Sequence, residues 1–479
     1  MSAPNQTAAA FGTQLLDHLT GARWFAGKGR TPELVGLTPL PWLSEPGAWP
    51  AVRCEVAEVR YVEDGPASAG SDTAPGGPNE LYQLALSYWP QPQPQLGHAE
   101  IARLRDPELG DVVVYDAMQD STACRRFLRR LTAGASGSAV AGGSEVRFHV
   151  LAPDVLAGDL EPRTFTGQQS NTSVMYGDVA MLKLFRRLEL GHNLDIEVHD
   201  ALSRAGNPDV ARLYGWVEAS WPAAEAASST GGPHQLTADL AMVVEKLGDA
   251  EDGWQLAMHT LDTGEDFADR AASLGRALAE IHDALRQQFG SSEVNGGKVA
   301  AVMAERLRAA ARIAPALDEH SDGLQRCFEA LGQQDLLTQR VHGDFHLGQT
   351  LFTPGGWKII DFEGEPVKTL AERAAPDSVW RDIAGMLRSF DYAAASVPGP
   401  AARAWADTCR SAFVRGYLGG DLSAADEVVL RAYLADKAAY EVVYETRNRP
   451  DWVQIPLGAV EAIASAQARP TAAAERVKE

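Results

Sequence analysis

The 479-residue sequence has few of the features that mark extracellular or membrane proteins. It contains only four cysteines, and these are too scattered to match the paired spacing of a metal site. Scattered cysteines in a long chain are typical of reduced thiols in the cytosol. The sequence has no run of about 18 apolar residues that could cross a membrane, and its first residues lack the basic and apolar segments of a leader peptide. We therefore expect a soluble, cytoplasmic protein.

Positive charge is also scarce. The sequence has 43 Lys and Arg against 64 Asp and Glu, which gives a formal net charge of −21. A nucleic-acid-binding protein normally presents a basic face, so this balance argues against that class. It does not exclude ATP, because a nucleotide site needs only local positive charge and a metal ion. Apolar residues make up 45% of the chain, enough for more than one hydrophobic core and hence more than one domain.

Two common phosphate-binding motifs are missing. The dipeptide Gly27-Lys28 is not part of G-x-x-x-x-G-K-[ST], so we expect no nucleotide role for Lys28. The polar turn at 166–173 lacks G-x-G-x-x-G, but it leads through a short strand into the apolar segment 179–185, which contains Lys183. This layout is typical of the N-lobe of a kinase, where the lysine binds ATP phosphates. The alternative is an edge strand whose lysine extends into solvent.

The most informative stretch is 340–366. It contains Asp344, then Gln349, then an apolar strand that ends at Asp361. Phosphoryl transfer from ATP needs one carboxylate to orient the acceptor hydroxyl and accept its proton, and an amide and a second carboxylate to hold Mg²⁺. We predict these roles for Asp344, Gln349 and Asp361, respectively. The alternative is a polar loop in which His342 and His346 are buried and hydrogen-bonded.

A second polar cluster lies near the C-terminus. Glu441, Tyr444 and Glu445 recur at spacings of three and four residues, which places them on one helical face. Carboxylates bind hydroxyl groups and an aromatic ring stacks on a sugar, so this face with the nearby Trp452 predicts a sugar site. The alternative is a solvated helix whose acids pair with Arg447 or Arg449.

The motifs His342-Gly343-Asp344-Phe345-His346 and Ile360-Asp361-Phe362 resemble the catalytic and metal-binding segments of the aminoglycoside-phosphotransferase and choline-kinase-like fold. The usual amide there is Asn, where this chain has Gln349. The narrower form G-D-x-H-L-G-Q with I-D-F-E-G-E-P is similar to actinobacterial maltokinases and their sugar-kinase siblings. The segments 23–28 and 440–457 extend the resemblance over nearly the whole chain.

The resemblance implies an α+β, bilobal, protein-kinase-like fold with an extra N-terminal β-rich cap. We expect the cap at 1–145, the kinase-like N-lobe at 146–247, and a mostly helical C-lobe at 248–479. The expected ATP-binding residues are Ser170, Asn171, Thr172, Lys183 and Glu245. The expected substrate-binding residues are Asp344, His346, Glu441, Tyr444, Glu445, Trp452 and Gln454.

Three further residues receive supporting roles. Glu197 is a candidate partner for Lys183, as in kinases. Asp195 is interpreted as a charge at a helix N-terminus, and Asp382 as a brace for the catalytic loop.

The acceptor is the least determined feature. Phe345, Thr350, Val453 and Gln454 depart from the maltokinase form, and two acids on one helical face suit a sugar amine. We therefore expect an ATP- and Mg²⁺-dependent kinase that converts D-glucosamine to its 6-phosphate. A maltokinase that makes maltose 1-phosphate is the alternative, and a catalytically silent kinase-fold regulator is a third. We expect no nucleic-acid or membrane partner, and a monomer or weak homodimer.

Overall fold

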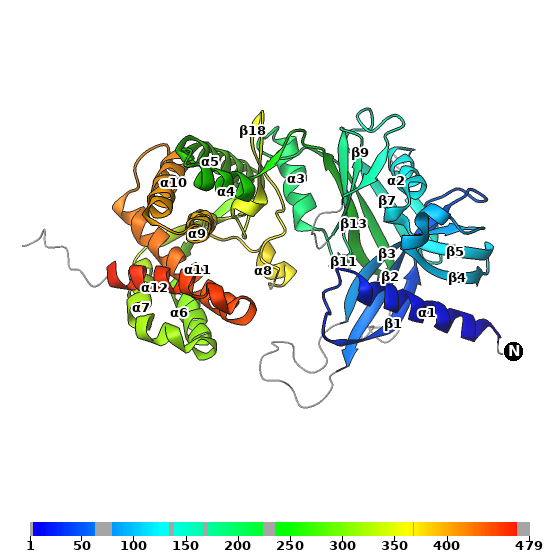
Figure 1. Cartoon of the computed structure of the whole chain (residues 1–479), viewed down its shortest axis with the longest axis horizontal. Coiled ribbons are helices and arrows are strands. Elements are labelled where there is room, and N and C mark those ends of the chain that lie inside the picture. The colour runs from blue at the N-terminus through cyan, green and yellow to red at the C-terminus, as the bar shows by residue number, and fades with distance from the viewer. Residues whose placement is uncertain are drawn as a thin grey trace, which may run out of the picture. The chain divides into compact units, whose positions relative to one another are not determined.

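The computed structural model describes residues 3–62, 79–133, 138–165, 171–223, 235–366 and 368–466. The chain forms two compact units, each built from discontinuous segments (Figure 1). The first unit comprises Met1–Glu197 and Arg212–Leu247, and the second comprises Val198–Ala211 and Gly248–Glu479. The expected cap and most of the expected N-lobe thus fall within unit 1, while 198–211 belong to unit 2; the division at 145 stays a prediction.

The first sheet of unit 1 is antiparallel and has the order β1-β2-β3-β5-β4, with the short strand β11 paired to β3. Its strands are β1 (Thr31–Pro39), β2 (Ala51–Val62), β3 (Glu80–Trp89), β4 (Glu100–Asp106), β5 (Gly110–Asp116) and β11 (Arg187–Leu188). Helix α1 (Ala3–Gly21) buries Leu15 and Leu19 against this sheet, in one cluster with Tyr82 and Tyr88. The alternating segments at 51–61 and 80–88 are therefore strands, as their pattern predicts.

The second sheet of unit 1 carries Lys183. Its order is β6-β7-β12-β13-β10-β9-β8. The strands are β6 (Ser138–Ala141), β7 (Ser144–Val150), β8 (Pro162–Thr164), β9 (Thr172–Tyr176), β10 (Ala180–Leu184), β12 (Leu213–Pro222) and β13 (Gln235–Glu245), and helix α2 (Ser121–Ala133) follows the first sheet in the chain. Lys183 pairs with Ser173 on one side and with Met242 on the other. Strand β10 is therefore central, and the edge-strand interpretation of Lys183 is wrong.

Unit 2 is mostly helical. Its helices are α4 (Gly253–Thr263), α5 (Ala268–Phe289), α6 (Gly296–Ile313), α7 (Ser321–Leu331), α8 (Leu370–Ala374), α9 (Trp380–Ala395), α10 (Pro400–Leu418), α11 (Ala424–Asn448) and α12 (Gln454–Ala466). Two small sheets complete it: β14 (Glu251–Asp252), β17 (Thr350–Thr353) and β18 (Gly356–Ile359) form one, and β15 (Ser291–Asn295) and β16 (Asp335–Gln339) the other. Helix α3 (Leu194–Arg204) begins in unit 1 and ends in unit 2.

The core of unit 2 depends on close helix packing. A Cβ atom on Gly275 of α5 would lie 2.2 Å from the carbonyl oxygen of Phe413, and one on Gly416 of α10 would lie 2.1 Å from that of Ala272. These two glycines allow α5 and α10 to approach each other, and both helices contribute to the large cluster that surrounds α9 (Figure 1).

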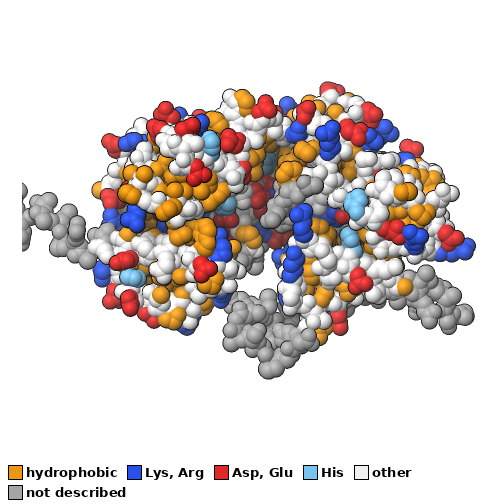
Figure 2. Space-filling model, viewed as in Figure 1, with side chains coloured by type: hydrophobic (Ala, Val, Ile, Leu, Met, Phe, Trp, Pro, Cys, Tyr) orange, Lys and Arg blue, Asp and Glu red, His pale blue; other side chains and the backbone are white. Residues whose placement is uncertain are grey.

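The face of unit 2 seen in Figure 2 carries side chains of both charges. On the face of unit 2 seen in Figure 2, acidic and basic side chains alternate with apolar patches, so the excess of acids is not gathered in one area of that face. Of the helices that the structure describes, none combines the length and apolar character needed to span a bilayer.

Candidate active site

Asp344 lies in the loop between β16 and the 3₁₀ turn Leu347–Gln349. Asp382 of α9 fixes the backbone of this loop by hydrogen bonds. The Asp382 carboxylate accepts the backbone N–H groups of His342 at 2.7 Å and Gly343 at 2.8 Å. His282 contacts the same carboxylate at 2.9 Å. Burial alone would raise the pKa of Asp382, but these hydrogen bonds and the nearby imidazoles hold it below its usual value. The interpretation of Asp382 as a brace is confirmed.

The two histidines of the loop have structural contacts. His342 is buried between the rings of Phe345 and Phe362, and its Nε2 lies 3.0 Å from the carbonyl oxygen of Ile360. It therefore links the Asp344 loop to the segment that carries Asp361. Burial lowers the pKa of His346, and its Nδ1 accepts the N–H of Gly348 at 3.1 Å. The alternative interpretation is right for His342, while substrate contact by His346 stays a prediction.

Asp361 follows β18 in a conformation that few residues other than glycine adopt. Its φ is +67°, in the left-handed region, where strain is often retained at functional sites. Gln349 Nε2 donates to Asp361 Oδ2 at 3.1 Å. Carboxylate oxygens of Asp361 and Glu363 lie within 4.8 Å of each other. Glu363 was not among the predicted metal ligands, although its position two residues after Asp361 was a signal for it.

These three side chains fit a magnesium ion by their chemistry. Mg²⁺ prefers oxygen ligands and is usually held by one or two carboxylates. Asp361 and Glu363 would supply the carboxylates, and the Gln349 amide would supply a carbonyl oxygen after rotation of its terminal group. The interpretation of Gln349 as an amide that replaces the usual Asn is compatible with this arrangement, because its side chain reaches Asp361.

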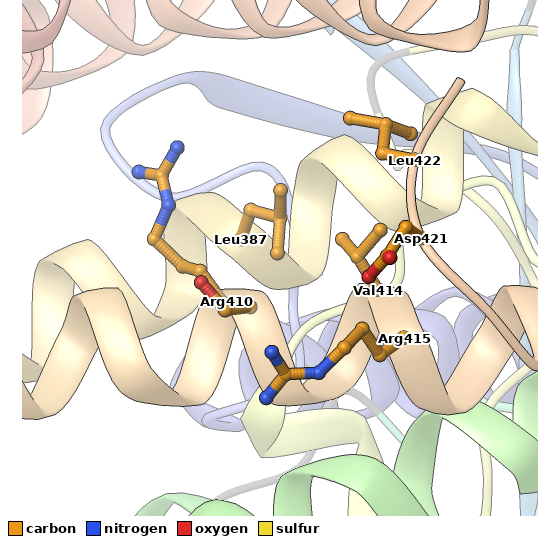
Figure 3. A pocket seen from close by; sticks show the side chains of 7 residues that line it. Leu387, Arg410, Val414, Arg415, Asp421 and Leu422 are labelled. Atoms are coloured by element: carbon orange, nitrogen blue, oxygen red, sulfur yellow. The ribbon is translucent and has the colours of Figure 1, made fainter.

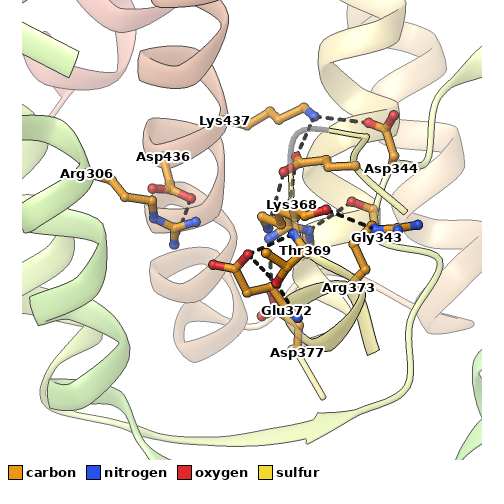
Figure 4. Close-up of polar contacts among 12 residues, drawn as sticks. Arg306, Gly343, Asp344, Lys368, Thr369, Glu372, Arg373, Asp377, Asp436 and Lys437 are labelled. Atoms are coloured by element: carbon orange, nitrogen blue, oxygen red, sulfur yellow. Dashed lines mark hydrogen bonds and ion pairs between the residues drawn. The ribbon is translucent and has the colours of Figure 1, made fainter. Parts of the chain in front are cut away.

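A lysine that was not among the predicted site residues lies beside Asp344. Lys437 of α11 places its Nζ 3.5 Å from Asp344 Oδ1 and 3.4 Å from Glu365 Oε1 (Figure 4). Arg381 binds Glu365 at 2.8 Å and also donates to the carbonyl oxygen of Gly343 at 3.0 Å. Lys368 contacts Glu365 at 3.2 Å. The three cations outweigh the effect of burial and lower the pKa of Glu365 to about 2.

The two acids predicted to bind sugar, Glu441 and Glu445, each form an ion pair with an arginine. Glu441 accepts from Arg388 Nε at 2.8 Å, and Glu445 accepts from Arg449 at 2.6 Å and from the Tyr392 hydroxyl at 3.1 Å. Both glutamates are buried. The alternative interpretation was therefore right about the pairing of Glu445 with Arg449 but wrong about a solvated helix.

The other predicted sugar-binding residues lie around this cluster. Trp452 stacks on Tyr392, with ring centroids 6.4 Å apart, and the Arg449 guanidinium lies 5.0 Å from the Trp452 ring. Tyr444 is 43% exposed, and Gln454 is exposed at the start of α12. The structure thus joins Glu441, Glu445 and Trp452 through arginines and Tyr392, while sugar binding by these residues stays a prediction.

A separate cavity of about 320 Å³ lies between α9 and α10 in unit 2 (Figure 3). It is lined by Leu387, Arg410, Ser411, Val414, Arg415, Asp421 and Leu422. None of the predicted catalytic, metal-binding or sugar-binding residues is among them. Arg410 is already paired with both carboxylate oxygens of Asp391 at 2.8 Å. This cavity therefore does not coincide with the site around Asp344.

Lys183 is paired with Asp195 in unit 1. Its Nζ lies 2.9 Å from Asp195 Oδ2, and the Asp195 side chain is only 3% exposed. Asn193 caps α3, because its Oδ1 accepts the N–H of Asp195 at 2.9 Å and that of Ile196 at 3.3 Å. The interpretation of Asp195 as only a helix-terminal charge is therefore wrong. Pairing of Glu197 with Lys183 stays a prediction.

The other predicted ATP-binding residues belong to two strands or adjoin them. Asn171 precedes β9, Thr172 is its first residue, and Glu245 is the last residue of β13. Asn171 Oδ1 accepts the backbone N–H of Arg186 at 3.4 Å, and Thr172 Oγ1 accepts from Arg186 Nε at 2.7 Å. Glu245 donates its N–H to the carbonyl oxygen of Arg212 at 2.8 Å. Ser170 lies outside the described residues. Their contacts with ATP stay predictions.

Two family models match the chain. The model described as the maltokinase N-terminal cap domain matches residues 18–120, and that of the phosphotransferase enzyme family matches residues 233–428. The chain is 30% identical over 322 residues to a glucosamine kinase of Streptacidiphilus jiangxiensis, which covers 60% of this chain and 70% of the relative. It is 28% identical over 334 residues to a glucosamine kinase of Mycolicibacterium smegmatis, which covers 63% of this chain and 79% of that relative.

Solved structures show the same fold. A glucosamine kinase in complex with glucosamine, ADP and inorganic phosphate matches with a TM-score of 0.60 and 22% identity, over 93% of this chain and 98% of that chain. A second crystal form of a glucosamine kinase matches with a TM-score of 0.62 and 22% identity, over 94% and 99% of the two chains. The expected α+β, protein-kinase-like fold with a β-rich N-terminal cap is therefore confirmed.

Proposed function

This chain belongs to the glucosamine kinase and maltokinase-like family of phosphotransferases and is an ATP-dependent sugar kinase, and we propose that it phosphorylates D-glucosamine to D-glucosamine 6-phosphate. The observation that carries the proposal is the position of Asp344 in a loop fixed by Asp382 and linked through His342 to the Asp361 segment. This arrangement keeps a carboxylate open to an acceptor, since the Asp344 side chain is 25% exposed.

Asp344 acts on the acceptor hydroxyl. Its carboxylate accepts a hydrogen bond from the 6-hydroxyl, aims the oxygen at the γ-phosphorus atom and receives the proton as the new P–O bond forms. The O–P bond to the β-phosphate breaks, and ADP leaves with that pair of electrons. Most of the rate enhancement comes from fixing this geometry, because the protein forms no covalent intermediate.

Asp361, Gln349 and Glu363 would hold Mg²⁺, which neutralises phosphate charge when it is bound. Lys183 would bind the ATP phosphates, as a lysine on a central strand does in kinases. Asp195 fixes the Lys183 ammonium through the ion pair at 2.9 Å. We also propose that the enzyme works in the cytoplasm, as a monomer or weak homodimer.

The alternative acceptor is maltose, phosphorylated at its anomeric hydroxyl. One observation favours a neutral sugar: Glu441 and Glu445, which were expected to bind the amine, are each paired with an arginine. The match of the maltokinase cap model to residues 18–120 points in the same direction. Two 28–30% identical glucosamine kinases support glucosamine as the first choice.

A coupled ADP-release assay tests the proposal. The full-length protein with Mg²⁺ and ATP is offered glucosamine, glucose, maltose and an aminoglycoside, and the acceptors are ranked by kcat/KM. We expect glucosamine to rank first and the product to carry phosphate on the 6-oxygen, as phosphorus NMR coupling would show. A preference for maltose would replace the proposal with the alternative. No ADP release with any acceptor, together with no thermal shift by Mg-ATP, would favour a silent kinase-fold protein.

A further inference from the structure

The Asp344 carboxylate has a positively charged neighbour that the proposed reaction does not require. Lys437 Nζ lies 3.5 Å from Asp344 Oδ1, and both side chains are open to solvent, at 23% and 25% exposure. Figure 4 shows the lysine side chain extended from α11 toward Asp344. A lysine in this position bears directly on the charge that an acceptor meets at the catalytic base.

The contacts of Lys437 are long. A charge-assisted hydrogen bond between an ammonium and a carboxylate usually measures about 2.7–2.9 Å. The two carboxylate contacts of Lys437 measure 3.5 and 3.4 Å. An ammonium group has three donors, so Lys437 can turn toward an acceptor that enters beside Asp344. Asp344 and Glu365 outweigh the effect of burial and raise the pKa of Lys437 above its usual value, so the group is a cation at neutral pH.

Glu365 does not depend on Lys437 for its compensation. Arg381 contacts its carboxylate at 2.8 Å and Lys368 at 3.2 Å. Removal of the Lys437 charge would therefore leave Glu365 paired, whereas Asp344 would lose the positive neighbour that the structure gives it. The main effect of Lys437 falls on the acceptor side of Asp344.

We propose that Lys437 sets the charge preference of the acceptor site, by repelling the ammonium group of an amino sugar bound beside Asp344 and by donating to a hydroxyl group of a neutral sugar. This inference rests on the proposed sugar kinase function and concerns the same site. Two cations in one acceptor site repel each other, so Lys437 weakens the binding of a protonated amine. A neutral sugar has no such charge and gains a hydrogen-bond donor from Lys437.

Lys437 lies on the face of α11 that carries the predicted sugar-binding residue Glu441. Lys437 and Glu441 are four residues apart on α11, so their side chains lie one turn from each other. The Lys437 ammonium also lies 5.4 Å from the centroid of the Tyr440 ring, which is 36% exposed. Lys437 is therefore placed between the Asp344 carboxylate and the Tyr440 ring.

The test compares glucosamine with glucose, which has a hydroxyl group in place of the amine. Lys437→Met removes the charge and keeps most of the aliphatic stem. We expect the ratio of kcat/KM for glucosamine to kcat/KM for glucose to rise about tenfold, mainly through a lower KM for glucosamine and a higher KM for glucose. Lys437→Arg keeps the positive charge, and we expect its ratio to remain near that of the unchanged enzyme.

Lys368→Met is the matched control. It removes a lysine from the same Glu365 carboxylate, which Lys368 contacts at 3.2 Å through the oxygen that Lys437 does not contact. We expect its ratio to stay unchanged. An equal rise in the Lys368 and Lys437 variants would overturn the proposal, because the effect would then come from the Glu365 network.

Binding measurements separate this inference from the proposed function. Isothermal titration with each sugar in the presence of Mg-ADP gives the same ratio without turnover, and Lys437→Gln serves as a second variant if the Met variant unfolds. An unchanged or lower ratio in an enzyme that phosphorylates glucosamine refutes the inference alone. An unchanged enzyme that neither binds nor phosphorylates these sugars refutes both.

Discussion

Asp382 accepts the backbone N–H of His342 at 2.7 Å with one carboxylate oxygen and that of Gly343 at 2.8 Å with the other. A side chain from the first turn of α9 thus fixes the backbone directly before Asp344. Asp382 has no exposed surface, so it acts by holding the loop and does not reach a substrate. The catalytic geometry consequently depends on a residue that lies 38 positions beyond Asp344 in the sequence.

The first prediction concerns this brace. Asp382→Asn retains one carbonyl oxygen but replaces the other acceptor with an NH₂ group, which cannot accept a backbone N–H. We expect kcat to fall about 100-fold through displacement of Asp344, with little change in the dissociation constant of ATP. Steady-state kinetics and ATP titration measure both quantities.

Tyr417→Phe is the control for this brace. It removes the hydroxyl that lies 2.9 Å from His282 Nδ1 while it leaves the Asp382 carboxylate in place. We expect a much smaller loss of kcat. If both variants lost activity equally, the effect would belong to His282 and not to the two N–H bonds.

Asp344→Asn tests the proposed base. An amide has almost the same shape as the carboxylate but cannot accept the proton of the acceptor hydroxyl, so we expect kcat to fall by about 10²- to 10⁴-fold. ATP binding, measured by titration, should be nearly unchanged. Thermal unfolding checks that the variant is folded, and near-normal turnover would remove Asp344 from this role.

Gln349→Ala tests the proposed metal site. The variant loses the amide that reaches Asp361 at 3.1 Å, and we expect the Mg²⁺ concentration for half-maximal activity to increase several-fold. Glu363→Ala, measured in parallel, distinguishes the two outer members of the group. A Mg²⁺ requirement that changes in neither variant would leave Asp361 as the single supported ligand.

The sequence was most informative where the functional residues are close together in the chain. Asp344, Gln349 and Asp361 fall within 18 residues, and their predicted roles follow from their order and from the strand between them. The segments that form β2 and β3 were equally clear, because they are short apolar-rich runs bounded by turn residues, although the structure buries most residues on both of their faces. Local spacing carries enough information in such cases.

Contacts between distant segments could not be predicted in the same way. Lys437 and Asp344 are separated by 93 residues, and Arg388 and Glu441 by 53. The face of α11 was correctly placed on one side of a helix, but the spacing does not reveal that α9 supplies an arginine opposite it. The ion pair of Lys183 with Asp195 was not predicted either, although the two residues are only 12 positions apart in the chain.

Glu365 gives a prediction for the effect of pH on stability. Its pKa is lowered to about 2, because Arg381, Lys437 and Lys368 more than offset burial. The stabilisation from its charged form is therefore complete above its ordinary pKa of 4.5 and is lost as the pH falls toward 2. We expect Glu365→Gln to lower the free energy of unfolding by about 3 kcal/mol at neutral pH.

Urea unfolding at neutral pH and at about pH 3 measures the difference in free energy of unfolding between the unchanged protein and Glu365→Gln. This difference should be smaller at the lower pH. Glu372→Gln is the control, because Glu372 belongs to the same segment but is an exposed helix-capping acid that bonds Thr369. We expect Glu372→Gln to lower the free energy of unfolding by less than Glu365→Gln does. A Glu365 difference that stayed constant between the two pH values would show that the charge of this carboxylate does not stabilise the fold.

The last prediction concerns the contact between α5 and α10, which supports the helices of the catalytic unit. A methyl group at position 275 would lie 2.2 Å from a backbone oxygen, and backbone atoms cannot move aside as a flexible side chain can. We expect Gly275→Ala to lower the free energy of unfolding by about 2 kcal/mol or more.

Gly458→Ala in α12 makes the same chemical change where a Cβ atom meets nothing within 4 Å. Because alanine favours the helix, that variant should be about 0.5–1 kcal/mol more stable. Chemical unfolding of both variants measures the pair, and a stabilised Gly275→Ala variant would mean that α5 and α10 are not packed this closely.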